Sequence, residues 1–387
     1  MWAAIATYGT TGDVQPLLGL ACEMSRQGHR ITFAAPPTFR ARVVELGLEF
    51  IPLGPSIEID ELRDVYGRAF LHADCVSQVE LTLPLVVKHT PRMVKELTAA
   101  CEGADVLLSL PYQLAGRIVH ELTAIPLVSV HLSPFAGYNK RFAETSAGLI
   151  NEVRLCYGLE ELRDPLGIDG SSSLLALHAV SPDIIKRPRH WPAHFQITGF
   201  WFLDEDFTPE PELRAFIESG EPPVVVALGS MVHASPNQLA TTISEAIQRT
   251  GRRVVVQRGW TGLSLLGCSE KVHSVDFVPH RWLFERAGAV IHAGGAGTTA
   301  AALRAGAPSI VIPHWLDQYL WGHLIRERGC AADVIPFVDL TPEILAAAIE
   351  RSSDQAIRKS TIAIAHAIEN EAGVPTAISL IEHVLRR

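Results

Sequence analysis

The chain has 387 residues, 48% of them hydrophobic and 19% charged, and its formal net charge at pH 7 is −9. That length predicts two domains, and the hydrophobic content excludes long disordered tracts. The acidic balance and the lack of a dense basic run argue against nucleic acid as a partner. Six cysteines lie far apart with no Cys-x-x-Cys pair, which argues against a structural zinc site and a disulfide scaffold and favours a reducing compartment.

The N-terminal segment predicts a first β-strand rather than a signal peptide. Residues 2–7 are apolar, but no basic residue leads them, and a glycine-containing turn follows at residues 9–13. No apolar stretch is long enough to span a bilayer. The sequence therefore predicts a cytoplasmic protein without a transmembrane segment.

A helix is expected to follow this strand. Proline suits the first turn of a helix, so the helix is predicted to start near Pro16 and to end at Gly28, before a second strand at residues 30–35. The short crossover predicts a parallel sheet. On this reading Asp13 precedes the helix, and its carboxylate projects freely from the loop instead of capping the helix.

The remainder of the first half continues the alternation of strands and helices. Residues 58–102 are predicted to be helical, and the aromatic stretch 133–148 is predicted to be irregular. Further strands are expected at residues 49–53, 105–109, 127–131, 174–180 and 195–198.

A new α/β unit begins after an acidic, proline-rich segment at residues 204–211, which is typical of a linker. Strands are expected at residues 224–228, 253–257, 273–278, 289–292 and 309–312, and the last helices at 342–348, 355–369 and 376–385. We therefore expect a first domain at 1–203, a linker at 204–221, a second domain at 222–370 and a final helix at 371–387 that crosses back to the first domain. Two such domains place a ligand at the carboxyl ends of their strands, in the cleft between them.

The most informative motif follows the strand at residues 289–292. His292 ends this apolar strand, and Gly294, Gly295 and Gly297 precede Thr298 and an alanine-rich helical segment. Backbone N–H groups at a helix N-terminus bind phosphate, and three glycines in four residues exceed what a plain turn needs. The spacing matches neither a Walker loop nor the dinucleotide fingerprint. We expect phosphates at this turn, with a contact from His292.

Other polar and aromatic residues admit two interpretations. Asp317 and Gln318 either begin a helix or bind sugar hydroxyls, since a carboxylate and an amide together supply acceptors and donors. Trp260 and Phe277 either belong to a core or stack on a nucleotide base. The Asp-x-Asp spacing within residues 204–206 suits a metal-bound nucleotide, but its acidic setting favours a solvated charge run.

Asp13 is the candidate general base. It lies at the carboxyl edge of the first strand, where it could take a proton from an acceptor hydroxyl. The nearby helix dipole is expected to keep the carboxylate ionised, which makes it a weak base.

Five segments together resemble the inverting glycosyltransferases of the GT1 superfamily. They are residues 9–16, 198–202, 222–231, 292–299 and 317–318. The likeness covers nearly the whole chain and is greatest to bacterial natural-product enzymes of the vancomycin-group type and to sterol glucosyltransferases. It implies the GT-B fold, in which two Rossmann-like α/β domains with parallel sheets face each other across a cleft.

The resemblance also implies roles for individual residues. Asp13 would be the catalytic base, and the co-substrate would be a UDP- or dTDP-sugar, with no metal and no other cofactor. An acceptor pocket in the first domain is expected at His131, Ser133, Phe135 and Tyr138, whose character favours a hydrophobic aglycone. The donor would be bound by Thr10, Thr11, Gly12, Ser230, Trp260, Phe277, Val278, His292, Gly294, Gly295, Ala296, Gly297, Thr298, Asp317 and Gln318.

Several alternatives stay open at this point. The acceptor could be a sterol or another lipid, which would allow peripheral membrane contact. A nucleotide-sugar 2-epimerase would turn over without an acceptor, and a non-catalytic nucleotide-sugar-binding helper would transfer nothing. The sequence does not choose the sugar, the nucleotide, the acceptor or between O- and C-glycoside products.

Overall fold

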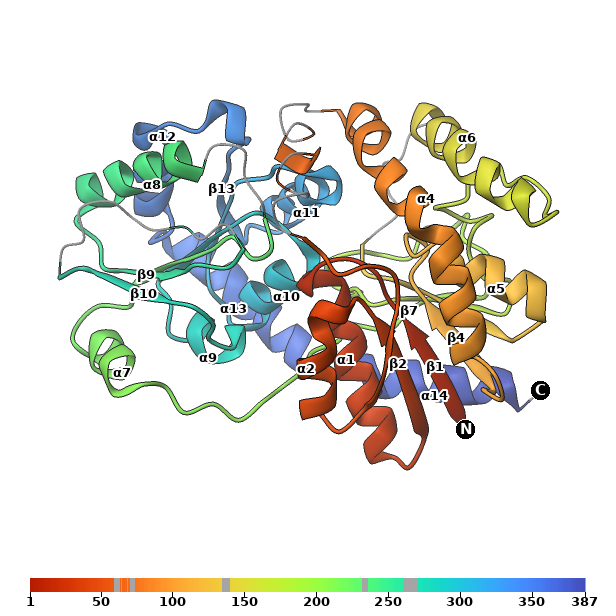
Figure 1. The fold of residues 1–387 in the computed structure, drawn as a ribbon. Coiled ribbons are helices and arrows are strands. Elements are labelled where there is room, and N and C mark those ends of the chain that lie inside the picture. Colours follow the sequence, from red (N-terminus) through yellow and green to blue (C-terminus); the bar gives the residue numbers. More distant parts are fainter. Residues whose placement is uncertain are drawn as a thin grey trace. The chain divides into compact units, whose positions relative to one another are not determined.

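The chain is described by a computed structural model in which two compact units are distinguished (Figure 1). It describes residues 1–58, 63, 65–67, 69, 74–133, 140–231, 236–260, 263 and 270–386. Unit 1 consists of Met1–Glu58, Asp74–Leu203 and Ala372–Arg387, and unit 2 of Ile59–Ala73 and Asp204–Glu371.

Unit 1 contains a seven-stranded parallel sheet in the order β3-β2-β1-β4-β5-β6-β7. Its central strands are continuous apolar runs, because both faces of a parallel sheet are covered by helices. The strands are β1 (Trp2–Ala6), β2 (Arg30–Ala35), β3 (Glu49–Pro52), β4 (Val106–Ser109), β5 (Leu127–His131), β6 (Leu175–His178) and β7 (Phe195–Ile197).

The helices of unit 1 agree with the expected alternation except in one stretch. They are α1 (Thr11–Arg26), η1 (Pro37–Phe39), α2 (Arg40–Glu45), α4 (Cys75–Ala100), α5 (Ala115–Thr123), α6 (Lys140–Cys156) and α14 (Gly373–Leu385). The prediction of an irregular stretch at 133–148 is wrong from Lys140 onward. Helix α6 buries Phe142, Ile150 and Val153, whose spacing is helical and which the aromatic composition of the stretch obscured.

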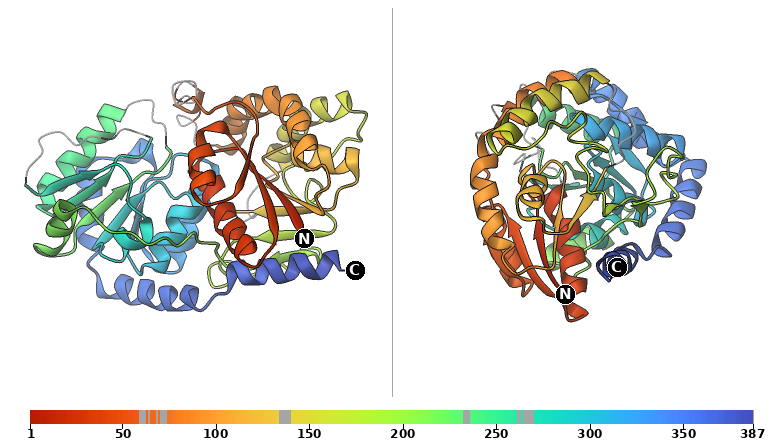
Figure 2. Two further views of the ribbon diagram at one scale, coloured as in Figure 1. Left: turned by 60° about the horizontal axis from the view of Figure 1, so that its bottom comes forward. Right: turned by 90° about the vertical axis from the view of Figure 1, so that its right-hand side faces the viewer.

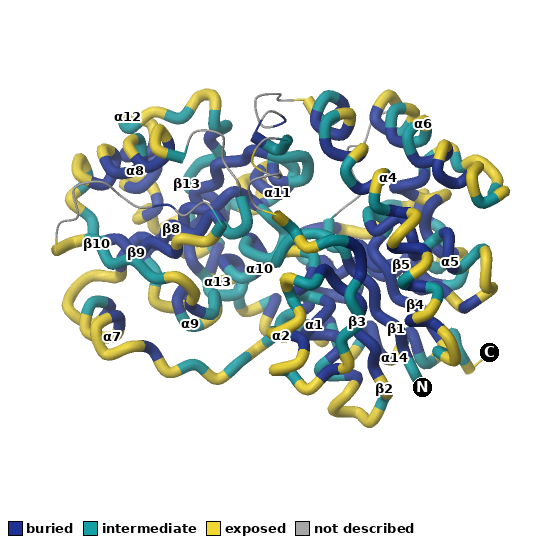
Figure 3. Tube along the Cα trace, in the orientation of Figure 1, coloured by how far each residue is buried: buried dark blue, intermediate teal, exposed yellow. Residues whose placement is uncertain are grey.

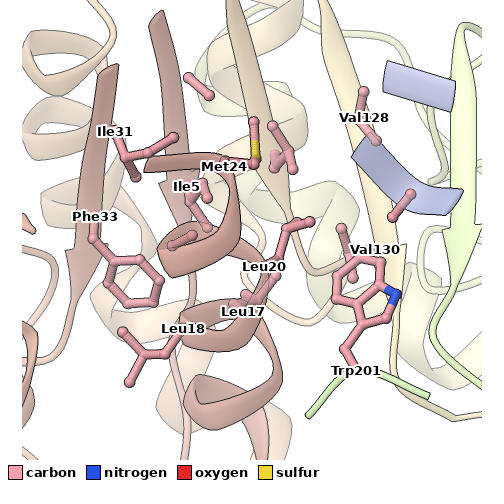
Figure 4. Packing of buried hydrophobic residues seen from close by; sticks show 14 of the residues in the cluster. Ile5, Leu17, Leu18, Leu20, Met24, Ile31, Phe33, Val128, Val130 and Trp201 are labelled. Atoms are coloured by element: carbon pink, nitrogen blue, oxygen red, sulfur yellow. The ribbon is translucent and has the colours of Figure 1, made fainter. Parts of the chain in front are cut away.

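The core of unit 1 lies between α1 and the sheet (Figure 4). Leu17, Leu20 and Met24 project from one side of α1 and are fully buried against strand residues such as Ile5 and Phe33. Each such side chain contributes about 1.5–3 kcal/mol when it is removed from water. This packing fixes the helix start that follows β1.

The last helix completes unit 1, although it follows unit 2 in the chain. Helix α14 lies beside α1 (Figure 2) and buries Ala377, Ile378 and Ile381. His29 Nε2 lies 3.2 Å from Glu382 Oε1 and adds a polar contact to the same helix.

We expect Gly373→Ala to destabilise the protein, against the usual trend for a helix. Replacing a helical glycine by alanine commonly gains up to about 1 kcal/mol. At Gly373 the new Cβ would lie 2.2 Å from the carbonyl oxygen of Phe200, so α14 must shift. Gly148→Ala in α6 is the matched control, because a Cβ there meets nothing within 4 Å. Thermal unfolding should give a lower Tm for Gly373→Ala and an unchanged or higher Tm for Gly148→Ala; equal shifts would contradict the steric account.

Unit 2 contains a six-stranded parallel sheet in the order β10-β9-β8-β11-β12-β13. In both units the central strands are buried, the edge strands β3 and β10 are less buried, and the outer faces of the helices are exposed (Figure 3). The elements are α7 (Pro211–Glu218), β8 (Val224–Ala227), α8 (Pro236–Thr250), β9 (Val254–Gln257), β10 (Val272–Val275), α9 (His280–Phe284), β11 (Ala289–His292), α10 (Ala296–Arg304), β12 (Ser309–Val311), α11 (Leu316–Glu327), β13 (Ala331–Val334), η2 (Phe337–Asp339), α12 (Pro342–Arg351) and α13 (Gln355–Glu369).

Two features of unit 2 differ from expectation. Strand β13 went unrecognised because it is short and carries Asp333 among few apolar residues. The segment expected as linker contains α7, which buries Leu213 and Ile217 in a core of unit 2.

The strand orders locate the positions where a ligand would bind. In each sheet the order reverses between two neighbouring strands, β1 and β4 in unit 1 and β8 and β11 in unit 2. Open α/β sheets bind ligands beyond the carboxyl ends of the strands at such a reversal. The loops after β1, β8 and β11 are therefore the candidate binding loops. Among the described residues, none of the helices is both long and apolar enough to cross a membrane.

Candidate functional site

Asp13 belongs to the first turn of α1, which begins at Thr11. Its Oδ2 accepts hydrogen bonds from the backbone N–H of Thr10 at 2.7 Å and from the Thr10 hydroxyl at 3.2 Å. The expectation that α1 starts near Pro16 and leaves Asp13 free in a loop is wrong. Pro16 lies inside α1, in its second turn, and this capping arrangement extends the helix ahead of it.

The environment of Asp13 also corrects its expected protonation behaviour. Burial raises the pKa of the Asp13 carboxyl above its ordinary value, and the hydrogen bonds from Thr10 oppose this increase without cancelling it. The helix dipole was expected to dominate and to make Asp13 a weak base. Burial outweighs the hydrogen bonds to the carboxylate, so Asp13 is a stronger base than an exposed aspartate.

The turn after β11 combines one packed glycine with two open ones. Gly294 has φ +89°, and a Cβ there would lie 2.8 Å from the carbonyl oxygen of Gln318. Gly295 is the N-cap residue of α10, and no side chain caps that helix. At both Gly295 and Gly297 an added Cβ would meet nothing within 4 Å. Helix α10 therefore begins with uncapped N–H groups beside open space, as an anion site requires.

His292 supports this turn from inside the protein. Its side chain is fully buried, and its Nδ1 accepts a hydrogen bond of 3.1 Å from the backbone N–H of Gly294. The ring proton must then lie on Nε2. Burial, with a smaller contribution from His280, lowers the pKa of His292 to about 3, so the ring is neutral. His292 thus supports the turn through Nδ1, while its Nε2 has no hydrogen-bond partner among the described residues. The direct phosphate contact expected from sequence stays a prediction.

The loops after β8 and β9 meet beside this turn. The backbone N–H of Trp260 donates to the backbone carbonyl of Gly229 at 3.1 Å. A Cβ on Gly259 would lie 2.2 Å from the same carbonyl oxygen. A Cβ on Gly229, which has φ +63°, would lie 4.0 Å from Thr298 Oγ1. The structure therefore gathers Trp260, the loop carrying Ser230, and Thr298. Sequence reasoning missed Gly229 and Gly259, although a glycine directly after each strand was a usable signal.

Gln318 holds the start of α11. Its Oε1 accepts from the backbone N–H groups of His314 at 2.8 Å and Trp315 at 3.0 Å, and its Nε2 donates to Met231 Sδ at 3.1 Å. This buried amide is committed to protein groups, which corrects the expectation that it binds sugar hydroxyls. Asp317, in the first turn of α11, is partly exposed.

The aromatic residues expected near a nucleotide base differ in exposure. Phe277 is 58% exposed, so it is not a core residue, whereas its neighbour Val278 is buried. The side-chain amide of Gln257, at the end of β9, donates to the Val278 carbonyl at 3.4 Å. An exposed aromatic ring beside a fixed backbone suits stacking on a planar base.

The remaining predicted donor residues follow the carboxyl ends of strands in the two sheets. Thr11, Ser230, Trp260 and Thr298 are partly exposed, and Gly12 is exposed. Ala296 is the first residue of α10.

Of the predicted acceptor residues, the structure describes His131 and Ser133. His131 ends β5 and is buried, stacked on His178 at 4.5 Å between ring centroids, with its Nε2 3.0 Å from Ser171 Oγ. Burial, helped by His178, lowers the pKa of His131 well below its ordinary value. His131 is thus a neutral core residue and not part of a pocket lining. Ser133 is partly exposed, and Phe135 and Tyr138 lie outside the described residues.

Asp204, at the start of the acidic segment, forms ion pairs with arginines of two helices of unit 2, α9 and α10. Its two carboxylate oxygens each lie 2.8 Å from the Arg304 guanidinium at the end of α10, and Arg281 Nη1 lies 2.9 Å away. Asp204 is thus exposed, as expected of a solvated charge run, but it is also ion-paired, which the sequence did not predict. Within the described ranges, no cluster of three or more His, Cys, Asp or Glu could hold a metal ion.

Asp204→Asn should reduce stability at neutral pH and not in acid. Burial alone would raise the pKa of Asp204, but Arg304 and Arg281 outweigh it and lower the pKa below its ordinary value. A lowered folded-state pKa stabilises the protein above the unfolded-state value, about 3.9, and this stabilisation is lost as the pH falls through the folded-state value. Because Asp204 is about half exposed, we expect at most about 1 kcal/mol.

Denaturant unfolding at pH 7, 5 and 3.5 would measure the difference in unfolding free energy between the wild type and Asp204→Asn. This difference should shrink toward zero at pH 3.5. Asp206→Asn is the control, since this carboxylate is exposed and forms no ion pair with any of the described residues. A difference between Asp204→Asn and the wild type that stays constant over the three pH values would contradict the ion-pair account.

Comparison with known proteins found two matching domain families. Residues 3–137 match the glycosyltransferase family 28 N-terminal domain, and residues 247–383 match the erythromycin biosynthesis protein CIII-like C-terminal domain. Sterol 3-beta-glucosyltransferase UGT80A2 of Arabidopsis thaliana is 29% identical over 98% of this chain and 64% of its own length. O-mycaminosyltylonolide 6-deoxyallosyltransferase of Streptomyces fradiae is 29% identical over 99% of this chain and 97% of its own. The chain thus spans about two thirds of the plant sterol enzymes that it matches, 64% and 66% of their lengths.

Solved structures share the fold. The glycotransferase of kitacinnamycin has a TM-score of 0.74 at 20% identity, with 99% of each chain covered. Streptomyces sp. SF2575 glycosyltransferase SsfS6, complexed with thymidine diphosphate, has a TM-score of 0.72 at 20% identity over 99% of each chain. VinC in complex with dTDP has a TM-score of 0.73 at 17% identity over 100% of each chain. The two-sheet α/β arrangement predicted from the sequence is therefore confirmed as that of these glycosyltransferases.

Proposed function

Because this chain belongs to the glycosyltransferases of the GT-B fold, we propose that it moves a sugar from a UDP- or dTDP-sugar to a hydroxyl of a hydrophobic acceptor, with inversion at the anomeric carbon. The observation that carries this proposal is the turn after β11. Helix α10 starts there without a side-chain cap, and Gly295 and Gly297 leave space beside its N–H groups. A diphosphate fits such a site by hydrogen bonding and by charge.

The proposed donor site extends from this turn to the neighbouring loops. Phe277 would stack on the base, and Ser230 and Thr298 would reach the phosphates. Asp317 would accept hydrogen bonds from sugar hydroxyls, while Gln318 and His292 hold the backbone that surrounds them. Fixed N–H dipoles stabilise the charge that develops on the leaving diphosphate.

Asp13 is the proposed general base. It accepts the proton of the acceptor hydroxyl, whose oxygen attacks the anomeric carbon while the bond from that carbon to the diphosphate breaks. The raised pKa of Asp13 places its basicity nearer to neutral pH, where general bases act most effectively. Direct attack of this kind inverts the anomeric centre.

The proposed transfer requires no metal ion, since the helix dipole and N–H groups carry the charge stabilisation.

The proposed acceptor is an apolar natural product such as a polyketide, a peptide or a sterol. Relatives named for a tylonolide and for sterols support this class, and thymidine diphosphate in two of the similar structures supports a nucleotide donor. A lipid acceptor would bring peripheral membrane contact, and the cytoplasmic location stays a prediction.

A mass-spectrometric screen tests the proposed function directly. Purified protein is incubated with UDP- or dTDP-hexoses and a panel of apolar hydroxyl compounds, with and without EDTA. We expect a mass gain of one hexose residue in both conditions and an inverted anomeric configuration by NMR. Loss of nucleotide sugar to an epimer without an acceptor would favour a 2-epimerase, nucleotide binding without any turnover would favour a helper protein, and strict metal dependence would contradict the charge argument.

A further inference from the structure

Thr10 holds the carboxylate of Asp13 through one of its two oxygens. Both hydrogen bonds from Thr10, one from its N–H and one from its hydroxyl, end on Oδ2. Apart from Thr10, only the backbone N–H of Asp13 itself contributes a hydrogen bond to this carboxylate among the described residues. Thr7, which is fully buried, donates its hydroxyl to the backbone carbonyl of Asp13 at 3.2 Å and fixes the main chain at the same point.

Gly9 makes this geometry possible. A Cβ at this position would lie 2.3 Å from Asp13 Oδ2 and 2.7 Å from its Cγ, closer than any side chain allows. Its φ of +151° is also one that residues with a side chain rarely adopt. Two independent constraints therefore require glycine here, and the steric one arises from the Asp13 carboxylate itself.

Building on the proposed function, we infer that Gly9 and Thr10 act as a clamp that turns the Asp13 carboxylate so that Oδ1 is the proton-accepting atom. The acceptor's proton moves to Oδ1, its oxygen bonds to the anomeric carbon, and the diphosphate leaves with the electron pair of the broken C–O bond. The proton on Asp13 then passes to solvent. Thr10 is a positioning residue in this scheme, in place of the phosphate contact that its sequence position suggested.

The clamp also sets the strength of the base. Hydrogen bonds to a carboxylate stabilise its charged form and lower its pKa, whereas burial raises it. No charged side chain in the described structure contributes to the pKa of Asp13, so burial, the two Thr10 hydrogen bonds and a smaller contribution from the backbone N–H of Asp13 itself decide it. Removing one hydrogen bond should therefore raise the pKa further.

Thr10→Val tests this inference, because it removes the hydroxyl and keeps the N–H donor. We expect the acidic limb of the kcat/KM–pH profile to move up by about one to two pH units, as the loss of one hydrogen bond to a charged group predicts. The KM for the nucleotide sugar should stay within about twofold, since the substitution leaves the charges around the donor unchanged. Thr10→Ser should restore the wild-type profile, and a carbon NMR titration that compares the wild type with Asp13→Asn would measure the Asp13 pKa directly.

A matched control separates the clamp from simple helix capping. Thr341 is the N-cap residue of α12 and accepts from the Ile344 N–H at 3.3 Å. Thr341→Val should cost a similar amount of stability and leave the pH profile unmoved. Gly9→Ala should lower kcat by more than about tenfold without changing nucleotide affinity, because it displaces the base alone.

The outcomes are distinguishable. An active Asp13→Asn enzyme would remove Asp13 from the proposed mechanism. An inactive Asp13→Asn enzyme together with an unmoved profile in Thr10→Val would overturn the clamp and leave the base in place. A large rise in donor KM in Thr10→Val would overturn it as well, and would return Thr10 to the phosphates.

Discussion

Asp13→Asn is expected to lower the rate of sugar transfer by about 10²–10⁴-fold, the usual contribution of a general base. Asparagine has the same shape, and its side-chain oxygen can accept the hydrogen bonds that Thr10 donates to Oδ2. The fold around the first turn of α1 should therefore survive. The amide cannot take a proton near neutral pH, so the loss should fall on kcat.

The measurement combines steady-state rates with calorimetric binding of UDP and dTDP. Nucleotide Kd should stay within about twofold of the wild type, because no donor contact is removed. Asp354→Asn is the control: this aspartate caps α13 and accepts from the Ala356 N–H at 2.7 Å. It should change neither rate nor affinity. Near-normal turnover in Asp13→Asn would require another base.

Gly297→Asp should abolish donor binding while it leaves the fold intact or slightly more stable. Gly297 is the second residue of α10, and its added Cβ meets nothing. A carboxylate in the first turn of a helix gains about 0.3–1 kcal/mol from the helix dipole. The same charge stands where the diphosphate is proposed to bind, and a like charge about 4 Å away costs several kcal/mol near a protein surface.

Gly297→Asn is the control for charge, because asparagine has the same size as aspartate but carries no charge. We expect nucleotide affinity to be at least about tenfold weaker in Gly297→Asp than in Gly297→Asn, and the gap to narrow in high salt. Gly294→Ala should behave in the opposite way and lose stability, because its φ is +89° and its Cβ would press on the Gln318 carbonyl. Equal nucleotide affinities for the Asp and Asn variants would remove the phosphates from this turn.

The alternation of apolar runs and turn residues was sufficient to predict two parallel sheets. Strands such as β5 and β11 were located to the residue, because continuous apolar runs bounded by polar or glycine residues have few other interpretations. The start of α1 was misplaced because Pro16 was taken as a first-turn residue. The competing signal was Asp13 three residues after Thr10, which is a capping pattern.

The roles of buried polar residues could not be predicted in the same way. His292, Gln318 and His131 each lie at the end of a strand or the start of a helix, where a polar residue usually faces a ligand. Each is instead buried, with hydrogen bonds to its own protein. For Gln318 and His131 the partners include residues distant in sequence, Met231 and Ser171, of which a single sequence carries no record. His292 hydrogen-bonds to Gly294, two residues away, through a turn geometry that residue types alone do not specify.

The return of α14 to unit 1 has a consequence for domain exchange between related enzymes. A hybrid that takes residues 1–58 and 74–203 from one parent must take residues 372–387 from the same parent, because these three segments form one compact unit. Otherwise a foreign helix would meet the Phe200 carbonyl that requires glycine at position 373. A unit 2 that is exchanged as a whole therefore includes residues 59–73 as well as 204–371, and its last junction lies within residues 370–372, between α13 and α14.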